Sequence, residues 1–426
     1  MKVKQLPLIL LIVLLGLSAA CNTADTGSPA ISTPEETLDS LYPAVSETLE
    51  IPTSYPIITA PLDTESVYPV DETSVSVVPV ENFVPIQSLE MFADGQGWGL
   101  FNRYNLMHTS DSGLSWQEVT PQTSLIPEGE FGPSLDYFFL SGSTAWYMLW
   151  QFEEGTLFHT TDSGATWTEI GLGLPGKQLF FFDEVNGFLL SDLGVAAGSH
   201  YVALYSTSDA GLTWTMQFAH EPGLSKDLPE GGSKSGLSFL DINKGWIAGN
   251  APIDRFIYLY QTINKGQNWE VVDVLLPDEI SEVFFEAEPP IFFDNSAAIL
   301  PVRALGESSD FSLLFFNSAD AGESWQFASK IPAGTLYDFA DASTGMAGGS
   351  NALFKTMDGA KTWQDIFGSL SNGEYLIAVQ VVSAETAWIL TSPSPEDSNA
   401  RHLYQTTDGG VSWNLLQAEV VYSEPN

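Results

Sequence analysis

The sequence predicts an all-β protein, a seven-bladed β-propeller whose blades are four-stranded antiparallel sheets. One short phrase occurs seven times in the 426 residues and ends each time in tryptophan. It reads Leu or Phe, an aromatic residue or Met, any residue, Thr or Ser, any residue, Asp or Asn, any residue, Gly (Ala in one copy), any residue, Ser, Thr or Asn, Trp. A period of roughly 40 to 55 residues is typical of a propeller or a solenoid. Apolar runs bounded by Gly, Pro and Asp, with no helical periodicity in the mature chain, favour strands throughout.

The first 20 residues are predicted to be an export signal. Two lysines form a basic start, residues 6–17 form an apolar core too short to span a bilayer comfortably, and small residues precede Cys21. Cys21 is the only cysteine, and its setting resembles the cleavage site of a bacterial lipoprotein, with Ser18 where that motif usually has Leu. We expect a lipid on Cys21 and attachment to the extracytoplasmic face of a bacterial membrane. Ordinary cleavage after Ala20 would instead give a secreted protein with a free thiol.

Residues 21–82 are predicted to form a disordered stalk that holds the folded part away from the membrane. Residues 22–82 are rich in Ser, Thr and Pro and carry eleven acidic side chains but no Lys or Arg. Residues 75–80 could instead form a strand that closes the ring, and Pro79 would confine it to an edge. The formal net charge of −40 repels phosphate backbones, so nucleic acid is excluded as a partner.

Two landmarks define the strands of each blade. A small residue followed by a large apolar one begins the second strand, because the small residue allows close backbone approach and the apolar one fills space between sheets. The third strand ends at the Thr or Ser of the phrase, and the fourth begins at its Trp. The propeller is expected over residues 83–421, with a tail at 422–426. The small–apolar pairs are Gly97-Trp98, Ala145-Trp146, Gly187-Phe188, Gly245-Trp246, Ala298-Ile299, Gly345-Met346 and Ala387-Trp388.

The phrase suits a hairpin turn between strands three and four. Its carboxylate can accept hydrogen bonds from later backbone N–H groups, as Asn264 can through its amide oxygen, and the Thr or Ser supplies a second side-chain bond. Glycine takes a positive φ there without steric cost. The sixth copy has Gly359 one place early and Ala360 in the glycine position, which predicts a distorted turn. The Trp covers the hairpin. The Asp or Asn and the Trp of each copy are Asp111 and Trp116, Asp162 and Trp167, Asp209 and Trp214, Asn264 and Trp269, Asp320 and Trp325, Asp358 and Trp363, and Asp408 and Trp413.

This phrase resembles the Asp-box, or BNR repeat, of sialidases, some glycoside hydrolases, sortilin-type receptors and photosystem II stability/assembly factors. The resemblance covers about residues 84–421. It implies that the box residues are structural and lie away from the working face. A shared fold does not specify a shared function.

The face opposite the repeated turns is the expected binding side, because the second-to-third connections and the links between blades emerge there. The four arginines all lie between a second strand and a repeated turn. We predict that some of them bind an anionic group; the alternative is that they neutralise nearby acidic residues. These arginines are Arg103, Arg255, Arg303 and Arg401. The long links at 120–134, 218–236 and 273–290 carry, among their acidic residues, Glu128, Glu130, Glu221, Asp227, Glu230, Asp278, Glu279, Glu282, Glu286 and Glu288.

No catalytic residue, cofactor site or metal site is expected. The five histidines are scattered without paired ligand spacing, and no phosphate-loop or calcium-loop pattern occurs. The sequence favours a monomeric, non-catalytic binding or assembly scaffold that holds a protein or glycan partner. The single propeller is similar to the photosystem II stability/assembly factors, which implies a chaperone-like role, although the acidic charge and the stalk depart from that family.

A glycoside hydrolase is the alternative function. A sialidase-like site would require three arginines around a carboxylate and usually an Arg-Ile-Pro start, which is absent from the sequence. A xyloglucanase-like site would require two carboxylates across a cleft between two propellers. A surface receptor or adhesin is a third possibility, and the sequence does not separate it from the scaffold.

Overall fold

The computed structural model of the chain describes residues 84, 86–101, 103–123, 132–151, 154–220, 227–306, 311–369, 373–394 and 400–422. They belong to one compact unit. The predicted signal, Cys21, the stalk with its possible strand at 75–80, and Glu128, Glu130 and Glu221 lie outside these residues. The described residues form strands, with one short 3-10 turn, η1 (Phe367–Ser369). Within them, no helix is long and apolar enough to cross a membrane.

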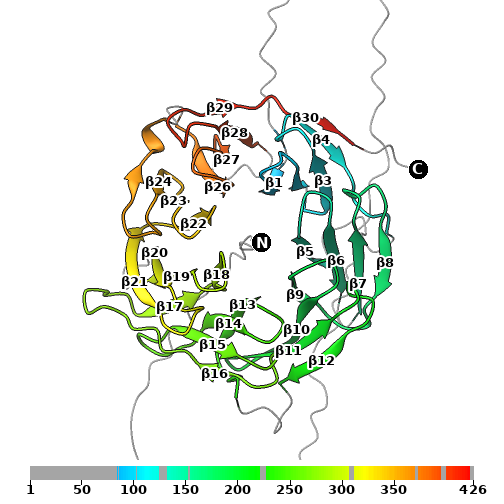
Figure 1. The fold of residues 1–426 in the computed structure, drawn as a ribbon, viewed down its shortest axis with the longest axis vertical. Coiled ribbons are helices and arrows are strands. Elements are labelled where there is room, and N and C mark those ends of the chain that lie inside the picture. Colours follow the sequence, from blue (N-terminus) through cyan, green and yellow to red (C-terminus); the bar gives the residue numbers. More distant parts are fainter. Residues whose placement is uncertain are drawn as a thin grey trace, which may run out of the picture. The chain divides into compact units, whose positions relative to one another are not determined.

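The strands form antiparallel sheets that follow one another around a common centre (Figure 1), which is the arrangement of a β-propeller. The first repeats form β1 (Ile86–Met91), β2 (Gly97–Phe101), β3 (Asn105–Thr109) and β4 (Ser115–Glu118); β5 (Ser134–Phe139), β6 (Ala145–Gln151), β7 (Glu154–Thr160) and β8 (Thr168–Gly171); and β9 (Lys177–Phe181), β10 (Gly187–Ala196), β11 (Ser199–Thr207) and β12 (Thr215–Ala219). The later repeats form β13 (Ser233–Phe239), β14 (Gly245–Asn250), β15 (Tyr258–Thr262) and β16 (Glu270–Val271); β17 (Phe284–Ala287), β18 (Ile291–Phe292), β19 (Ala298–Leu305), β20 (Phe311–Ser318) and β21 (Gln326–Pro332); β22 (Leu336–Phe339), β23 (Gly345–Gly349), β24 (Ala352–Thr356) and β25 (Gln364–Asp365); and β26 (Tyr375–Val381), β27 (Ala387–Ser392), β28 (His402–Thr406) and β29 (Asn414–Leu415), before a last strand, β30 (Glu419–Val421).

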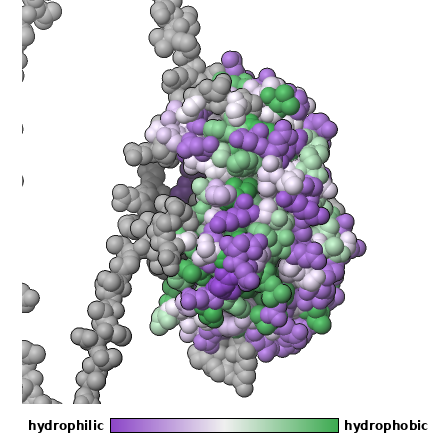
Figure 2. Space-filling model, turned by 90° about the vertical axis from the view of Figure 1, so that its left-hand side faces the viewer, coloured by the Kyte–Doolittle hydropathy of each residue, from purple (hydrophilic) through white to green (hydrophobic). Residues whose placement is uncertain are grey.

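The predicted strand landmarks are confirmed in every repeat. Each second strand begins at the small residue of the small–apolar pair, and each third strand ends at the Thr or Ser of the phrase. The fourth strand begins within one residue of the Trp. In Figure 1 the first strands lie nearest the centre and the fourth strands lie outermost. Hydrophilic and hydrophobic residues are interspersed over the rim that Figure 2 shows.

The fourth and fifth repeats join into one nine-stranded sheet, which the repeat pattern does not predict. Strand β14 of the fourth repeat pairs with β17 of the fifth only at Asn250 and Glu286. In the fifth repeat, β17 and β18 both pair with β19, and Pro289 and Pro290 separate them. Proline has no N–H to donate, so the first strand of this repeat is split into two short pieces.

The first and last sheets are joined by several contacts. The C-terminal strand β30 pairs in parallel with the outer strand β4 (Figure 1). Val84 N donates to Arg401 O at 2.9 Å, and Trp388 Nε1 donates to Ser112 O at 3.0 Å. Apolar residues of the two ends pack in one buried cluster, including Val84 and Trp388. The last residues of the chain therefore add an edge strand to the first sheet.

The large apolar residue at the start of each second strand packs between neighbouring sheets, as predicted. Trp98 Nε1 in the first sheet donates to Ser141 O in the second repeat at 2.8 Å. Trp146 is fully buried and stacks on Phe181 of the following sheet with ring centroids 3.7 Å apart. Such aromatic contacts stabilise the sheet-to-sheet interfaces through apolar burial.

Candidate functional site

The strand order of each sheet separates its connections between two ends. The first-to-second and third-to-fourth turns lie at one end, which we call the turn face. The second-to-third connections and the links to the next sheet lie at the other end, the loop face. The repeated phrase lies on the turn face, and the long links lie on the loop face.

On the turn face, the first copy shows how the repeated turn is held. Thr109 Oγ1 donates to Asp111 Oδ1 at 2.9 Å and accepts from Gly113 N at 3.0 Å. Ser115 donates to Asp111 twice, from N at 2.8 Å and from Oγ at 2.6 Å. Burial alone would raise the pKa of Asp111, but the hydrogen bonds from Ser115 and Thr109 outweigh it and lower the pKa. The turn therefore favours an ionised carboxylate.

The fourth copy keeps this arrangement with an amide. Asn268 N donates to Asn264 Oδ1 at 3.0 Å, as predicted for the amide oxygen, and Asn264 Nδ2 donates to Asn268 Oδ1 at 3.0 Å. An amide accepts hydrogen bonds only at its oxygen, and here an acceptor side chain faces its nitrogen. In the carboxylate copies a Ser or Thr hydroxyl donates instead, and such bonds lower the pKa of Asp320 and Asp408 to about 2.

The distortion predicted for the sixth copy is wrong. Ala360 N donates to Thr356 Oγ1 at 3.0 Å, and Thr362 N donates to Asp358 Oδ1 at 2.9 Å, as in the other copies. The reason is that each turn contains two successive residues with positive φ. Gly359 takes the first position with φ 72°, and Ala360 takes the second with φ 64°. Glycine at either position relieves part of the strain.

A main-chain bond adds to each turn. The N–H of the first positive-φ residue donates to a carbonyl in the first-to-second connection of the same sheet. This bond measures 2.8 Å from Ser112 N to Gly95 O and 2.9 Å from Ser163 N to Ser143 O. The polar groups of the repeated turns thus bind one another, which agrees with a structural role for the box residues.

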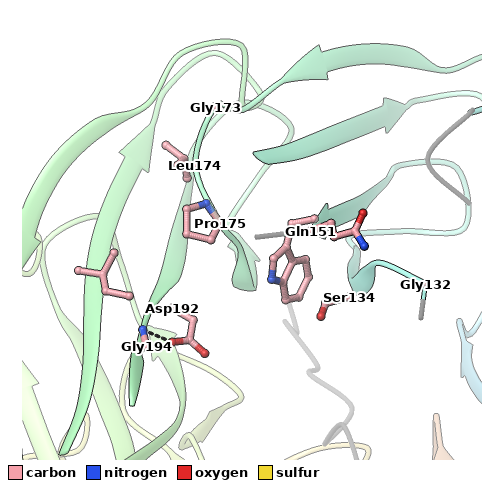
Figure 3. A pocket seen from close by; sticks show the side chains of 10 residues that line it. Gly132, Ser134, Gln151, Gly173, Leu174, Pro175, Asp192 and Gly194 are labelled. Carbon is pink, nitrogen blue, oxygen red and sulfur yellow. Dashed lines mark hydrogen bonds between the residues drawn. The ribbon is translucent and has the colours of Figure 1, made fainter. Parts of the chain in front are cut away.

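On the loop face, a cleft of about 570 Å³ opens between the sheets β5–β8 and β9–β12. Trp150 and Gln151 at the end of β6 line one side. Leu174, Pro175 and Asp192 line the other side, and Figure 3 shows these three facing the end of β6 across the space. The cleft therefore lies on the side that the sequence predicts for binding.

Gly176 lets the two sides of the cleft approach each other. A Cβ at this position would lie 3.1 Å from Trp150 Cε3 and would also press on Met148. Without that side chain, the half-buried Trp150 packs against the link that leads into β9. The position of the indole is thus held by the backbone of the neighbouring sheet.

Asp192 is the charged residue among those that line the cleft. Gly194 N donates to Asp192 Oδ1 at 2.7 Å, and His200 Nε2 lies 3.5 Å from the same oxygen, which is long for a hydrogen bond. The contact with His200 and then the Gly194 bond lower the pKa of Asp192. Asp192 Oδ2 has no partner among the described residues, and Figure 3 shows the carboxylate directed into the cleft.

A buried lysine fixes the residues behind Asp192. Lys234 N donates to His200 Nδ1 at 3.1 Å, which places the imidazole proton on Nε2, toward Asp192. Lys234 Nζ donates to the carbonyls of His200 at 2.9 Å, Pro229 at 2.7 Å and Glu230 at 2.9 Å. Burial lowers the pKa of Lys234 to about 8. These bonds hold the link before β13 against the tip of the β10–β11 hairpin.

The strands near the centre carry a group of mixed charge. Asp136 of β5 accepts a hydrogen bond from Leu179 N at 2.6 Å; its side chain is only half-buried by exposed area, yet the surrounding protein atoms raise its pKa to about 7. Burial lowers the pKa of Lys177, while Asp192, Asp136 and Glu286 oppose that effect. Burial, together with the neighbouring carboxylate of Glu288, raises the pKa of Glu286.

Two of the predicted anion-binding arginines are engaged by the protein itself. Arg303 Nε donates to Glu288 Oε1 at 2.8 Å, and Arg303 Nη1 donates to Thr335 O at 3.0 Å. Arg255 donates to the carbonyls of Ile280, at 2.5 Å, and of Pro277, at 3.0 Å. The Arg303–Glu288 pair is the local neutralisation that the alternative expects, whereas Arg255 holds main-chain carbonyls of the link at 273–290.

The other two arginines lie in the first and last repeats. The guanidinium of Arg103 lies 5.0 Å from the ring centre of Tyr104, and Arg401 Nη1 donates to Ala400 O at 3.2 Å. The four arginines thus lie in four different repeats, none of them among the residues of the cleft. Their role in binding an anion stays a prediction.

Within the described ranges, no three His, Cys, Asp or Glu side chains gather as a metal site. The repeat pattern does not single out Trp150, Gln151 or Asp192. The signal that could have found them is the length of the hairpin beside the cleft, because β10 has 10 residues and β11 has 9.

Comparison with known proteins gives structural likeness alone. No family model and no curated protein matches the chain. YCF48 bound to D1 peptide matches at 18% identity and a TM-score of 0.49, over 76% of this chain and 92% of that one. YCF48 from Cyanidioschyzon merolae matches at 15% and 0.46, over 77% and 97%. The GH74 xyloglucanase from Xanthomonas campestris matches at 11% and 0.35, over 79% and 45%. At these values the likeness says nothing about what this chain binds.

Proposed function

We propose that this chain is an extracytoplasmic, lipid-anchored, monomeric binding scaffold that holds a protein or glycan partner on its loop face. The proposal rests on the difference in hydrogen bonding between the turn face and the loop face. On the turn face the repeated side chains bind one another, as Thr109, Asp111 and Ser115 do. On the loop face, Trp150, Gln151 and Asp192 line an open cleft with polar atoms available to a ligand. Convergent polar groups beside an aromatic ring are typical of binding sites.

The scaffold is a seven-bladed propeller with Asp-box turns in this proposal. The phrase and its turn occur seven times, and a single residue pair, Asn250 with Glu286, joins the two repeats of the nine-stranded sheet. Counting that sheet as two blades gives one blade for each copy of the phrase. The parallel pairing of β30 with β4 would then complete the first blade from the C-terminus.

The proposed location rests on the N-terminal sequence. The basic start, the short apolar run and the single cysteine at position 21 support export and lipid attachment. Intact-mass analysis of the membrane-bound chain should show a diacylglyceryl modification at Cys21. The Cys21→Ser variant should lose it and leave the membrane fraction. An unmodified Cys21 in the mature chain would contradict the anchor and leave a secreted protein.

The binding function is tested by photo-crosslinking in the native cell. A photoreactive amino acid at Gln151 probes the loop face, and the same amino acid at the exposed Leu212, in the third repeated turn, serves as the matched control. We expect a discrete adduct from position 151 and none from position 212. Equal adducts from both positions, or no adduct from position 151, would contradict the loop-face scaffold.

A glycoside hydrolase is the second candidate, because the raised pKa of Glu286 is a property of general acids. It ranks lower because Glu286 lies in the ladder opposite Arg303 and is not among the residues of the cleft. Release of reducing ends from a glycan panel by the intact chain, abolished by Glu286→Gln, would reverse the order. Unchanged glycans would leave the scaffold as the better proposal.

A further inference from the structure

We propose that the cleft between the sheets β5–β8 and β9–β12 binds a basic side chain, lysine or arginine, presented by an extended segment of a protein partner. The inference rests on the proposed function and narrows it to a chemical class of ligand. It depends on three observations at the cleft: an available carboxylate oxygen, an aromatic ring beside it, and a strand edge without a partner.

Charge is the first observation. Among the described residues that line the cleft, Asp192 alone carries a charge, and its Oδ2 is open while Oδ1 is held by Gly194. The nearby lysine that acts on Asp192 is Lys177, which attenuates the carboxylate. Asp136 and Glu286 in turn act on Lys177 and offset its positive charge in part. The chain as a whole has a formal charge of −40. An ammonium or guanidinium is therefore attracted, and an anionic group is repelled.

The aromatic ring is the second observation. Trp150 is half-buried, with its ring supported by the link at Gly176 and its remaining surface in the cleft. A cation beside an indole and a carboxylate gains from both, since the ring face attracts positive charge and the carboxylate accepts hydrogen bonds. Ser134 and Gln151 are exposed at the same cleft and can accept the remaining N–H groups.

The strand edge is the third observation, and it favours a peptide over a free amine or a sugar. Residues 192–196 of β10 pair with β11 around a bulge between Asp192 and Gly194, but β9 ends opposite Ser191, so no described strand covers their inner edge. Leu193 and Val195 in this stretch are 44% and 76% exposed. An extended segment can lie along such an edge, with apolar contacts outside the cleft and one side chain inside it. A neutral sugar would gain nothing from the negative potential.

Fluorescence anisotropy with two labelled peptides tests this inference. The first peptide is Ser-Val-Arg-Val-Ser, and the second carries citrulline, which has the shape of arginine without its charge. The protein is the full chain purified in detergent, at about 0.15 M salt, where distant charges are screened. We expect the citrulline peptide to bind about tenfold more weakly. Asp192→Asn and Trp150→Ala should each weaken the arginine peptide to a similar extent.

Three further variants make the test specific. Asp254→Asn removes an exposed carboxylate away from the cleft and should change binding by less than about twofold. Lys177→Gln removes the competing cation and should tighten binding. Gln151→Lys puts a cation at the rim and should weaken binding strongly, while Gln151→Ala removes only one neutral acceptor and should weaken it much less; this pair keeps the test informative if Asp192→Asn fails to fold.

Equal affinity of the protein for the two peptides would overturn the inference. A loss of affinity for the arginine peptide as large in Asp254→Asn as in Asp192→Asn would overturn it too. The failure of this inference can be distinguished from the failure of the proposed function. If the peptides fail but position 151 still crosslinks a partner, the scaffold stands and the basic ligand is wrong. If position 151 captures nothing in the cell, the proposed function itself is contradicted.

Discussion

Replacing the carboxylate of one repeated turn should destabilise the whole chain by an amount that depends on the replacement. Asp111 accepts three side-chain or main-chain bonds, from Thr109 Oγ1 at 2.9 Å, Ser115 N at 2.8 Å and Ser115 Oγ at 2.6 Å. Because solvent competes for this exposed carboxylate, each bond contributes about 1 kcal/mol and not the larger value of a buried one. Asp111→Ala should therefore lower the free energy of unfolding by about 3 kcal/mol.

Asp111→Asn should cost less than the alanine variant. The amide oxygen can keep the bonds from Thr109 Oγ1 and Ser115 N, as Asn264 Oδ1 does with Asn268 N in the fourth copy. The remaining bond must reverse, with the amide Nδ2 donating to Ser115 Oγ, and it loses its charge assistance, which is worth about 1 kcal/mol. Urea unfolding followed by tryptophan fluorescence measures both variants. An alanine variant within about 0.5 kcal/mol of the parent, or an asparagine variant as unstable as the alanine one, would refute this account of the turn.

The sign of the pH dependence gives an internal check. The folded pKa of Asp111 is lowered, so its stabilisation is present above the usual carboxyl pKa and is lost as pH falls through that range. The difference in the free energy of unfolding between the parent and Asp111→Asn should therefore be smaller at pH 3 than at pH 7. A difference that stayed constant would mean that the charge of the carboxylate contributes nothing to the turn.

Two further predictions concern other parts of the fold. The pKa of Asp136 is raised to about 7, so between about pH 4 and pH 7 the folded state keeps a proton that the unfolded state has lost, and the stability that this proton contributes falls as pH rises through this window. Asp136→Asn should make the thermal unfolding temperature fall less between about pH 4 and pH 7, whereas the exposed Asp254→Asn should not. An unchanged dependence of the unfolding temperature on pH in Asp136→Asn would contradict this prediction. Truncation after Ala418 removes β30 from the edge of β4 and should speed amide exchange in β3 and β4, whereas truncation after Tyr422 should not; equal exchange would show that β30 does not protect this edge.

Much of the fold could be predicted because its landmarks are local. The residue that begins a second strand must be small where the backbone passes a neighbouring side chain, as Gly187 and Gly245 show beside Phe181 and Phe239. The residue that ends a third strand must offer a hydroxyl to the turn. Both requirements recur at the same places in each repeat, so the sequence period shows them directly.

The errors arose where one residue type can serve at two positions or where neighbours in the chain interrupt a strand. The repeated phrase shows one glycine position, which predicts a distorted sixth turn, but two successive residues of each turn have positive φ and glycine serves at either. The split first strand of the fifth repeat follows from Pro289 and Pro290. Arg103, Arg255 and Arg401 lie between a second and a third strand as predicted, but the placement of Arg303 is wrong, because it lies within the second strand β19. Spacing also does not reveal that Arg303 pairs with Glu288.

The cleft could not be predicted because its residues come from segments between the landmarks. Asp192 belongs to the extension of β10, Trp150 to the end of β6, and Pro175 to a link between sheets. Their proximity depends on how two neighbouring sheets pack, which no period in the sequence reports. The length of the β10–β11 hairpin indicates which repeat borders the cleft, but it does not indicate which residues of the neighbouring sheet face it.

Two tryptophans on strand β6 show how one strand serves both stability and binding. Trp146, near the turn face, is fully buried, stacks on Phe181 and donates from Nε1 to Ala210 O at 2.9 Å. Trp150, four residues later along the same strand, is half-buried at the cleft. Side chains an even number of residues apart on a strand lie on the same side of the sheet, so both tryptophans face the sheet β9–β12. The interface between these sheets is therefore packed at the turn face and open at the loop face, so a residue at the open end can change with the ligand while the buried end maintains the fold.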